Sequence, residues 1–286
     1  MSNGEPVAVV AVIHDSAPGL PSFLESVRTA TAAPLDIVLA HHGAQPAELA
    51  AIARTTDASA LRVVETGEVS YGRAANLGVR DTTAEFVALA DPAVVWTPGS
   101  LDALLAATRR WPRGAAFGPL IQNAQGTVYP SARSVPSLSS GIGHALFGWW
   151  LPNNRWTRAY RRARETPAER TTGWLVDTCV LLRRDAFDAI GGFEADQLVY
   201  LEDLELGERF AKAGWHNVYV PSAVVIGGSR QRDAIDRARL AADRHRSVWT
   251  YLSRRYAGWR WWPVRVVLRT GLGARAAVAR WLGRGR

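Results

Sequence analysis

Short apolar runs alternate with amphipathic stretches along the first 110 residues of the chain. The apolar runs are rich in β-branched residues and end at turn or cap residues, so they predict buried strands at 7–13, 35–40, 61–64 and 85–90. The stretches between and after them predict helices at 20–30, 47–55, 71–80 and 100–110. This alternation predicts an α/β fold with a mainly parallel sheet covered on both faces.

The pattern changes after residue 112. The segment 113–170 is rich in Pro, Gly, Ser and Trp, which predicts loops and substrate-facing insertions, some of them mobile, rather than a core layer. A strand is expected in the apolar half of 172–183, then a helix at 185–190, and another that starts near residue 200 and ends at Gly214.

In open α/β sheets, ligands bind beyond the carboxyl ends of the strands. The residues just after the predicted strands include His14, His41 and Asp91. His41 and His42 are adjacent and suggest a metal site, but neighbouring side chains at a strand end point to opposite faces, which favours a plain turn.

Length and composition narrow the class of protein. The 286 residues, 48% of them hydrophobic, suffice for one sizeable core or two modest ones, which argues against disordered, collagen-like and disulfide-scaffold classes. The lone Cys179 fits a reducing compartment. The N-terminus lacks a basic segment before its first apolar run, and no apolar run reaches about 18 residues, so we expect neither a secretory signal nor a spanning helix.

The positive charge is concentrated in a C-terminal tail. Residues 230–286 contain 15 Arg and 3 Asp and therefore carry a net charge of +12. The whole chain carries +8, so residues 1–229 carry −4. Tryptophans and tyrosines interleave with these arginines, a pattern typical of a helix on an anionic membrane. A surface for single-stranded nucleic acid has a similar composition, but no nucleic-acid motif accompanies it, so no nucleic acid is expected. A tail that packs its tryptophans against the rest of the protein is the third interpretation.

Four acids lie within seven residues at Glu202, Asp203, Glu205 and Glu208. Partly desolvated carboxylates raise one another's proton affinity, which is how a carboxylate becomes a base near neutral pH. Glu202 and Asp203 would point about 100° apart on a helix and would therefore have different tasks. The alternative is that acids in a first helical turn only complement the helix dipole.

Several stretches near these acids form a recognisable series. They are Gly191-Gly192-Phe193-Glu194, Tyr200-Leu201-Glu202-Asp203-Leu204-Glu205-Leu206, Ala213-Gly214-Trp215, the upstream run SYGRAANLG at 70–78 and RRDAF at 183–187. Together they resemble the signature of family 2 glycosyltransferases over about residues 7–255. The resemblance implies a GT-A fold, with a sugar-nucleotide-binding half at 1–112, an acceptor-binding and catalytic half at 113–229, and a basic helical extension at 230–286.

The resemblance also implies roles for individual residues. Asp203 matches the catalytic base of an inverting reaction, with Glu202 and Glu205 shaping its field. The implied contacts to the sugar nucleotide are His14, His41, Gly72, Arg73, Asn76 and Asp91, and those to the acceptor are Gly173, Trp174, Tyr200 and Glu205.

Within the family, further stretches resemble actinobacterial rhamnosyltransferases. They include residues 96–104, 118–121, 128–133 and 173–175. This likeness implies transfer of rhamnose from dTDP-rhamnose to a polyprenyl-diphosphate-linked or other cell-envelope glycan. It places the protein in the cytoplasm, peripheral to the inner face of the plasma membrane, and allows a homodimer.

Three elements near the donor depart from the family pattern. Asp91-Pro92-Ala93 lacks the second acid that normally binds a divalent cation, which leaves Asp91 as the one metal candidate in this element. Mn²⁺ or Mg²⁺ is therefore a weakly supported cofactor. His41 and His42 replace the turn that reads the nucleobase, and Gly227 replaces a late histidine.

The departures leave two hypotheses open. Arg73, Arg230 or Arg232 could partly replace the cation, and residues 227–230 could wrap a phosphate or form an ordinary loop. The alternative function is a catalytically impaired homologue that binds glycan or lipid or supports an active partner.

Overall fold

The computed structural model describes residues 6–14, 18–42, 61–135, 167–194, 201–227, 247, 249–251, 253–255 and 258–262. The helix expected at 47–55 lies outside these residues, as do Tyr200, Arg230 and Arg232. Among the described residues, no helix combines the length and the apolar character needed to cross a bilayer.

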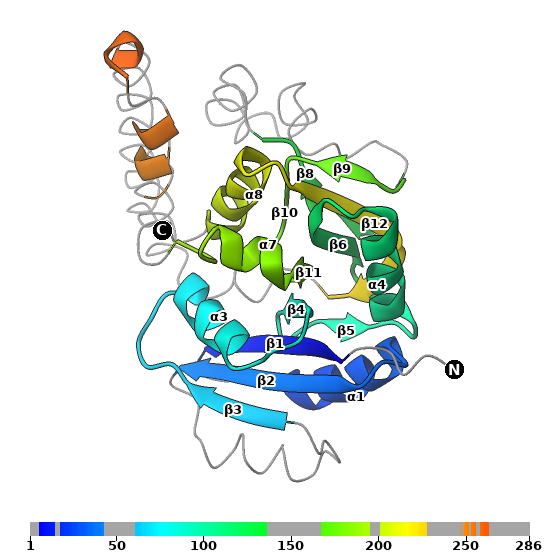
Figure 1. Cartoon of the computed structure of the whole chain (residues 1–286). Coiled ribbons are helices and arrows are strands. Elements are labelled where there is room, and N and C mark those ends of the chain that lie inside the picture. The colour runs from blue at the N-terminus through cyan, green and yellow to red at the C-terminus, as the bar shows by residue number, and fades with distance from the viewer. Residues whose placement is uncertain are drawn as a thin grey trace, which may run out of the picture.

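A twisted sheet of ten strands forms the centre of the molecule (Figure 1). Its main order is β3-β2-β1-β4-β11-β6-β12-β5, with β7 beside β6 and β9 beside β12, and β10 and β8 form a separate pair. The strands are β1 (Val7–His14), β2 (Leu35–His42), β3 (Leu61–Glu65), β4 (Phe86–Ala90), β5 (Val95–Trp96), β6 (Gly114–Gln122), β7 (Val128–Tyr129), β8 (Ala132–Arg133), β9 (Arg170–Thr172), β10 (Trp174–Leu175), β11 (Cys179–Arg183) and β12 (His216–Ile226).

The first four strands pair in parallel, as their alternation with helices predicts. β11 runs antiparallel to both β4 and β6, and β12 returns parallel to β6. The α/β fold class is therefore confirmed, with β11 reversed where the first half of the chain meets the second and the short strands β5, β7 and β9 reversed beside β12 and β6.

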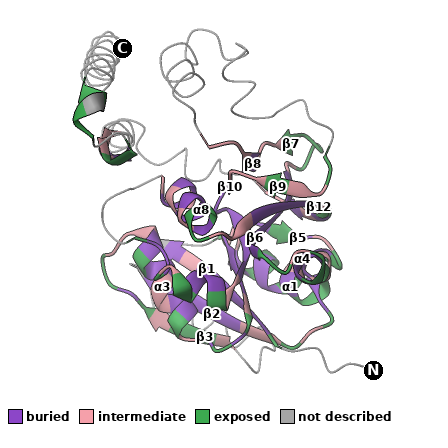
Figure 2. Cartoon of the chain, turned by 45° about the horizontal axis from the view of Figure 1, so that its top comes forward, coloured by how far each residue is buried: buried purple, intermediate pink, exposed green. Residues whose placement is uncertain are grey.

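Helices cover both faces of the sheet, because alternate residues of each strand point to opposite sides. Val7, Val9 and Ala11 of β1 pack in a core with α1 (Leu20–Ala30) and α4 (Ser100–Arg110). Ala8 and Val10 pack in a second core on the other face, with α3 (Tyr71–Arg80), α7 (Arg184–Ala189) and α8 (Glu202–Lys212). Figure 2 shows the buried residues concentrated in the sheet between these layers.

The expectation of loops throughout 113–170 is wrong at its start. Residues 114–121 form a wholly buried part of β6, paired with β11 and β12. A strand covered on both faces does not need alternating polar and apolar residues, so β6 has no strand pattern in the sequence. Its Gly and Pro residues made the segment resemble a loop. Glycine is needed at position 118 because a Cβ added there would lie 2.5 Å from the Leu175 side chain. Pro119 pairs with Val220, where the register of β12 shifts. Residues 136–166 lie outside the described part.

Candidate active site

Helix α8 carries the acid cluster and lies close against β10. A Cβ added at Gly207 would come within 2.7 Å of the Trp174 Cβ and 3.0 Å of its Cα. Any larger residue would push the helix away from the sheet. Asn217 of β12 reinforces this contact, since its Nδ2 donates to the carbonyls of Gly173 and Gly207 at 3.0 Å each. Gly173 is thus part of the scaffold that fixes the height of α8.

Asp203, in the first turn of α8, lines a small cavity of about 10 Å³. The cavity walls also include Asp177 and Asn217 as well as apolar side chains from β10, β11 and α8. The Oδ1 atom of Asp203 accepts the backbone N–H of Leu204 at 2.7 Å. The expected base therefore lines an internal cavity and is only partly exposed to solvent.

The pKa of Asp203 lies well above the ordinary range for an aspartate. Burial is the main cause, and the charge of Asp177 is the second. Arg133 and the Leu204 N–H lower the pKa, and Glu202 raises it by the smallest of these contributions. Asp203 thus binds a proton more readily than a solvent-exposed aspartate, but its helix neighbours are not the main reason.

Asp177 is the functional candidate that the sequence reasoning missed. It lies in the short segment between β10 and β11 and is 6% exposed. The available signal was an acid inside the apolar run WLVDTCVLL at 174–182. A buried acid that interrupts such a run has to face a partner or a site.

Arg133 brings a positive charge towards the acids. Its Nη2 donates to the Tyr129 hydroxyl at 2.7 Å, its Nε donates to the Pro130 carbonyl at 2.9 Å, and its guanidinium lies 5.0 Å from the centre of the Trp174 ring. Trp174 is buried, and its Nε1 donates to the Ser134 carbonyl at 3.2 Å. The described contacts of Trp174 hold Arg133 and α8 in place, and its contact with the acceptor stays a prediction.

Glu202 and Glu205 lie in different surroundings, as their angular separation predicts. Glu202 is buried at the start of α8. Glu205 lies 3.4 Å from Arg209, and burial raises its pKa while Arg209 lowers it. The charges of Glu194 and Lys212 have smaller effects on the pKa of Glu205, Glu194 raising it and Lys212 lowering it.

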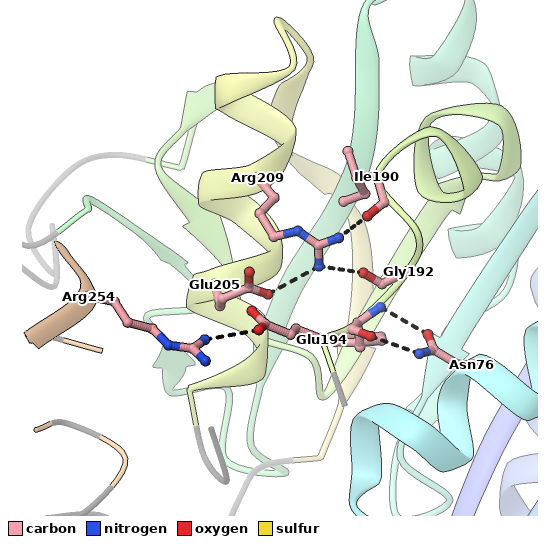
Figure 3. A network of polar contacts seen from close by, with 8 residues as sticks. Asn76, Ile190, Gly192, Glu194, Glu205, Arg209 and Arg254 are labelled. Carbon is pink, nitrogen blue, oxygen red and sulfur yellow. Dashed lines mark hydrogen bonds and ion pairs between the residues drawn. The ribbon is translucent and has the colours of Figure 1, made fainter. Parts of the chain in front are cut away.

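A set of polar contacts ties the Gly191-Gly192 turn to helices on either side (Figure 3). Asn76 of α3 donates to the Phe193 carbonyl at 2.8 Å and accepts the Phe193 N–H at 2.9 Å. Arg209 of α8 donates to the carbonyls of Ile190 and Gly192. Gly192 has φ +72 and leaves 2.5 Å between an added Cβ and the Asn76 Oδ1, so only glycine suits it.

The predicted residues for the sugar nucleotide are spread along the carboxyl edge of the first strands. His14 ends β1, and Gly72 packs on Phe193 inside the first turn of α3. Arg73 is exposed on the same turn. His41 at the end of β2 is 3% exposed, and its Nδ1 has no hydrogen-bond partner among the described residues. That orphaned nitrogen is a candidate contact for a bound nucleotide.

The residues around Asp91 do not fit a divalent cation. The Oδ1 atom of Asp91 accepts the Ala93 N–H at 2.8 Å, so it caps its own turn. A Cβ added at Gly227 would lie 2.8 Å from the Ala93 carbonyl. Ala93 and Gly227, the two positions that lack the family's ligands, therefore lie against each other. The described residues contain no group of three or more His, Cys, Asp or Glu suited to a metal ion.

The described part of the tail contacts α8 directly. The Tyr251 hydroxyl donates to Glu208 at 2.8 Å, and Arg255 donates to both Glu208 and the Tyr251 oxygen. Tyr251 also packs with Trp174 and Leu204 in a small apolar cluster. Tyr251 and Arg255 thus hold the described part of the tail to α8. Trp259, Trp261 and Trp262 are exposed, so the packing of tail tryptophans that the third interpretation expects does not occur at these three residues.

Comparisons with known proteins agree with this geometry. A family model described as "Glycosyltransferase like family 2" matches residues 6–259. An N-acetylglucosaminyl-diphospho-decaprenol L-rhamnosyltransferase of Mycobacterium tuberculosis is 42% identical over 94% of this chain and 91% of its own length. The O-antigen biosynthesis protein RfbC of Myxococcus xanthus is 26% identical over 81% of this chain, but only 18% of its own length is matched.

Two solved structures share the fold. A mannosyltransferase of Pyrobaculum calidifontis, in complex with GDP-Man and Mn²⁺, has a TM-score of 0.55 over 98% of this chain and 79% of its own, at 16% identity. GalNAc-T7 with UDP, GalNAc and Mn²⁺ has a TM-score of 0.58 over 78% of this chain, at 15% identity, and this chain spans 44% of its length. These likenesses confirm the GT-A fold.

Proposed function

The chain belongs to the Glycosyltransferase like family 2, and on that premise we propose that it is an inverting transferase that moves rhamnose from a nucleotide-diphosphate sugar to a lipid-linked glycan. The observation that carries the proposal is the position of Asp203, which lines the cleft at the start of α8 with a raised pKa. The 42% identity to the mycobacterial rhamnosyltransferase supports the choice of sugar and acceptor, with dTDP-rhamnose as the donor.

Asp203 acts as the general base of the reaction. Its carboxylate takes the proton of an acceptor hydroxyl as that oxygen bonds to the anomeric carbon, and the bond from that carbon to the diphosphate breaks on the opposite face. The nucleoside diphosphate leaves with the bonding electron pair. A base whose pKa is raised towards neutrality is better matched to an alcohol than an ordinary aspartate. The rigid turn at 190–193 and β10 hold α8, which keeps the base in register with the sugar.

The sugar nucleotide binds along the carboxyl ends of β1, β2 and β4. His41 is the residue proposed to meet the nucleobase, because its buried Nδ1 has no partner among the described residues. Arg73, exposed on the first turn of α3, is proposed to contact the diphosphate, as are Arg230 and Arg232, which lie outside the described part. Since the surroundings of Asp91 do not fit a cation, these arginines supply the positive charge that stabilises the leaving group.

The tail is proposed to rest on an anionic membrane surface at the cytoplasmic face. Two tryptophans of the η1 turn (Trp259–Trp261) and Trp262 directly after it are exposed. The exposed fractions are 80% for Trp259, 41% for Trp261 and 59% for Trp262. Exposed indoles beside a net charge of +12 are suited to a bilayer interface with anionic lipid. A lipid-linked acceptor would then be presented next to α8, to which the tail is attached.

Transfer of radiolabelled rhamnose from dTDP-rhamnose to a polyprenyl-diphosphate-linked N-acetylglucosamine tests the function. Asp203→Asn is expected to lower the rate by about 10²-fold or more, because the amide cannot accept the proton. Thermal stabilisation by the donor should persist in this variant. Asp188→Asn, an equivalent change on the exposed side of α7, is the matched control and should keep full activity.

Two results would contradict the proposal in different ways. Full activity of Asp203→Asn would remove Asp203 from the role of base. An absence of both transfer and thermal stabilisation across dTDP-, UDP- and GDP-sugars would favour the catalytically impaired homologue.

A further inference from the structure

Two acidic residues from distant parts of the chain line one small cavity. Asp203 comes from the first turn of α8, and Asp177 comes from the turn that leads into β11. Asp177 is 6% exposed, so its charge is little screened by water. The sequence separates the two residues, and only the packing of α8 across β10 brings them to the same cleft.

Backbone contacts fix the position of Asp177 on both sides. The Tyr71 hydroxyl of α3 donates to the Asp177 carbonyl at 3.4 Å, and the Asp91 N–H donates to the carbonyl of Thr178 at 2.9 Å. The N–H of Val176 donates to the Ser131 carbonyl at 3.0 Å. The segment is thus bound to the end of β4 and to the loop before β8, and it cannot move away from Asp203 without breaking these bonds.

The charged groups that bear on Asp203 come from three elements. Asp177 on the β10–β11 turn and Glu202 on α8 oppose ionisation of Asp203, and Arg133 on β8 favours it. Asp177 has the largest effect of the three. The charge of Asp177 thus offsets the lowering effect of Arg133 on the pKa of Asp203.

We propose that Asp177 is a positioning residue for the transfer step, which makes Asp203 a stronger acceptor for the proton of the sugar acceptor. This inference rests on the proposed function. A negative charge close to Asp203 favours the protonated product of the transfer, so the carboxylate of Asp203 removes the hydroxyl proton more completely as the new glycosidic bond forms.

The pH dependence of kcat/KM in the isosteric variant Asp177→Asn tests the proposal. Removal of the negative charge lowers the pKa of Asp203, so the acid limb of the profile should move to lower pH. The plateau rate should fall as well, because the base is weaker, but by less than the loss in Asp203→Asn. Asp188→Asn should leave the acid limb at the wild-type pH. An acid limb that stays in place in an active Asp177→Asn variant would overturn the proposal.

A second measurement does not depend on activity. Because burial and Asp177 raise the pKa of Asp203, the stability linked to this group is complete below the ordinary aspartate pKa and is lost as the pH rises through the raised value. At about pH 8, Asp203→Asn should therefore raise Tm, and by less in an Asp177→Asn background than in the wild type. Equal increments in both backgrounds would show that the two side chains are uncoupled. If the wild type transfers no sugar, the proposed function fails, and this cycle still decides whether the two acids interact.

Discussion

At the scale of single residues, the chemistry of the site depends on which side chains are present at a few crowded positions. Asp203 owes its raised pKa to burial and to Asp177 rather than to its helix neighbours. Ala93 and Gly227 stand where the family's cation ligands are expected. A Cβ added at Gly227 would lie 2.8 Å from the Ala93 carbonyl oxygen, so a histidine at position 227 would displace the backbone there.

The geometry around Asp91 predicts that transfer does not require a divalent cation. Rates measured with excess chelator should stay within about twofold of rates with Mn²⁺, since the proposed arginines supply the charge on the diphosphate side. Ala93→Asp should not increase the rate with Mn²⁺, because Gly227 packs against the Ala93 backbone and the Asp91 carboxylate is already bonded to the Ala93 N–H. Loss of activity on chelation, restored by Mn²⁺, would show instead that a cation is bound.

At the scale of elements, α8 is held between the sheet and the tail. On the sheet side, Gly207 allows the close approach to Trp174, and Arg209 fixes the turn that precedes the helix. On the tail side, Glu208 accepts from Tyr251 and Arg255, and Arg254 pairs with Glu194 at 3.0 Å. The domain division at residue 229 stays a prediction, but the described tail contacts make α8 depend on both parts.

The two neighbouring arginines of the tail should differ in their effect on stability. Glu208 is 10% exposed in its side chain, so Arg255→Met leaves a buried carboxylate with one partner fewer and should cost about 1–3 kcal/mol of unfolding free energy. Glu194 is 42% exposed, so Arg254→Met should cost less than about 1 kcal/mol. Denaturant unfolding of both variants measures the difference. Equal losses would mean that the contact with Glu208 does not hold the tail to α8.

At the scale of the whole molecule, the C-terminal sequence carries the positive charge, and its described part exposes three tryptophans. In Figure 1 the orange segments, which are the described part of the tail, lie beside α8 and away from the sheet. The body of the protein carries a net −4, whereas residues 230–286 carry +12. An anionic surface would therefore attract the tail end and leave the first strands of the sheet facing solution.

Vesicle flotation checks this orientation. The protein should float with vesicles that contain anionic lipid, less so in high salt, and should not float with neutral vesicles. Trp259→Ser combined with Trp262→Ser should weaken binding by about tenfold, as the burial of two indoles predicts. Val63→Ser, a change of an exposed apolar residue on the edge strand β3, is the matched control and should bind normally. Equal flotation with both lipids, or with neither, would exclude the electrostatic contact.

The sequence by itself determined the α/β layers, the approximate bounds of β1–β4, α1, α3 and α4, and the location of the acid segment. These features depend on the hydrophobic period and on motifs of neighbouring residues. It did not reveal β6, since a strand buried on both faces has no alternation and its glycines read as loop. Nor did it reveal that Asp177 faces Asp203, that Gly227 lies on Ala93 or that Glu208 accepts from Tyr251. Those pairs join residues far apart in the chain, and only the antiparallel insertion of β11 and the packing of α8 bring them together.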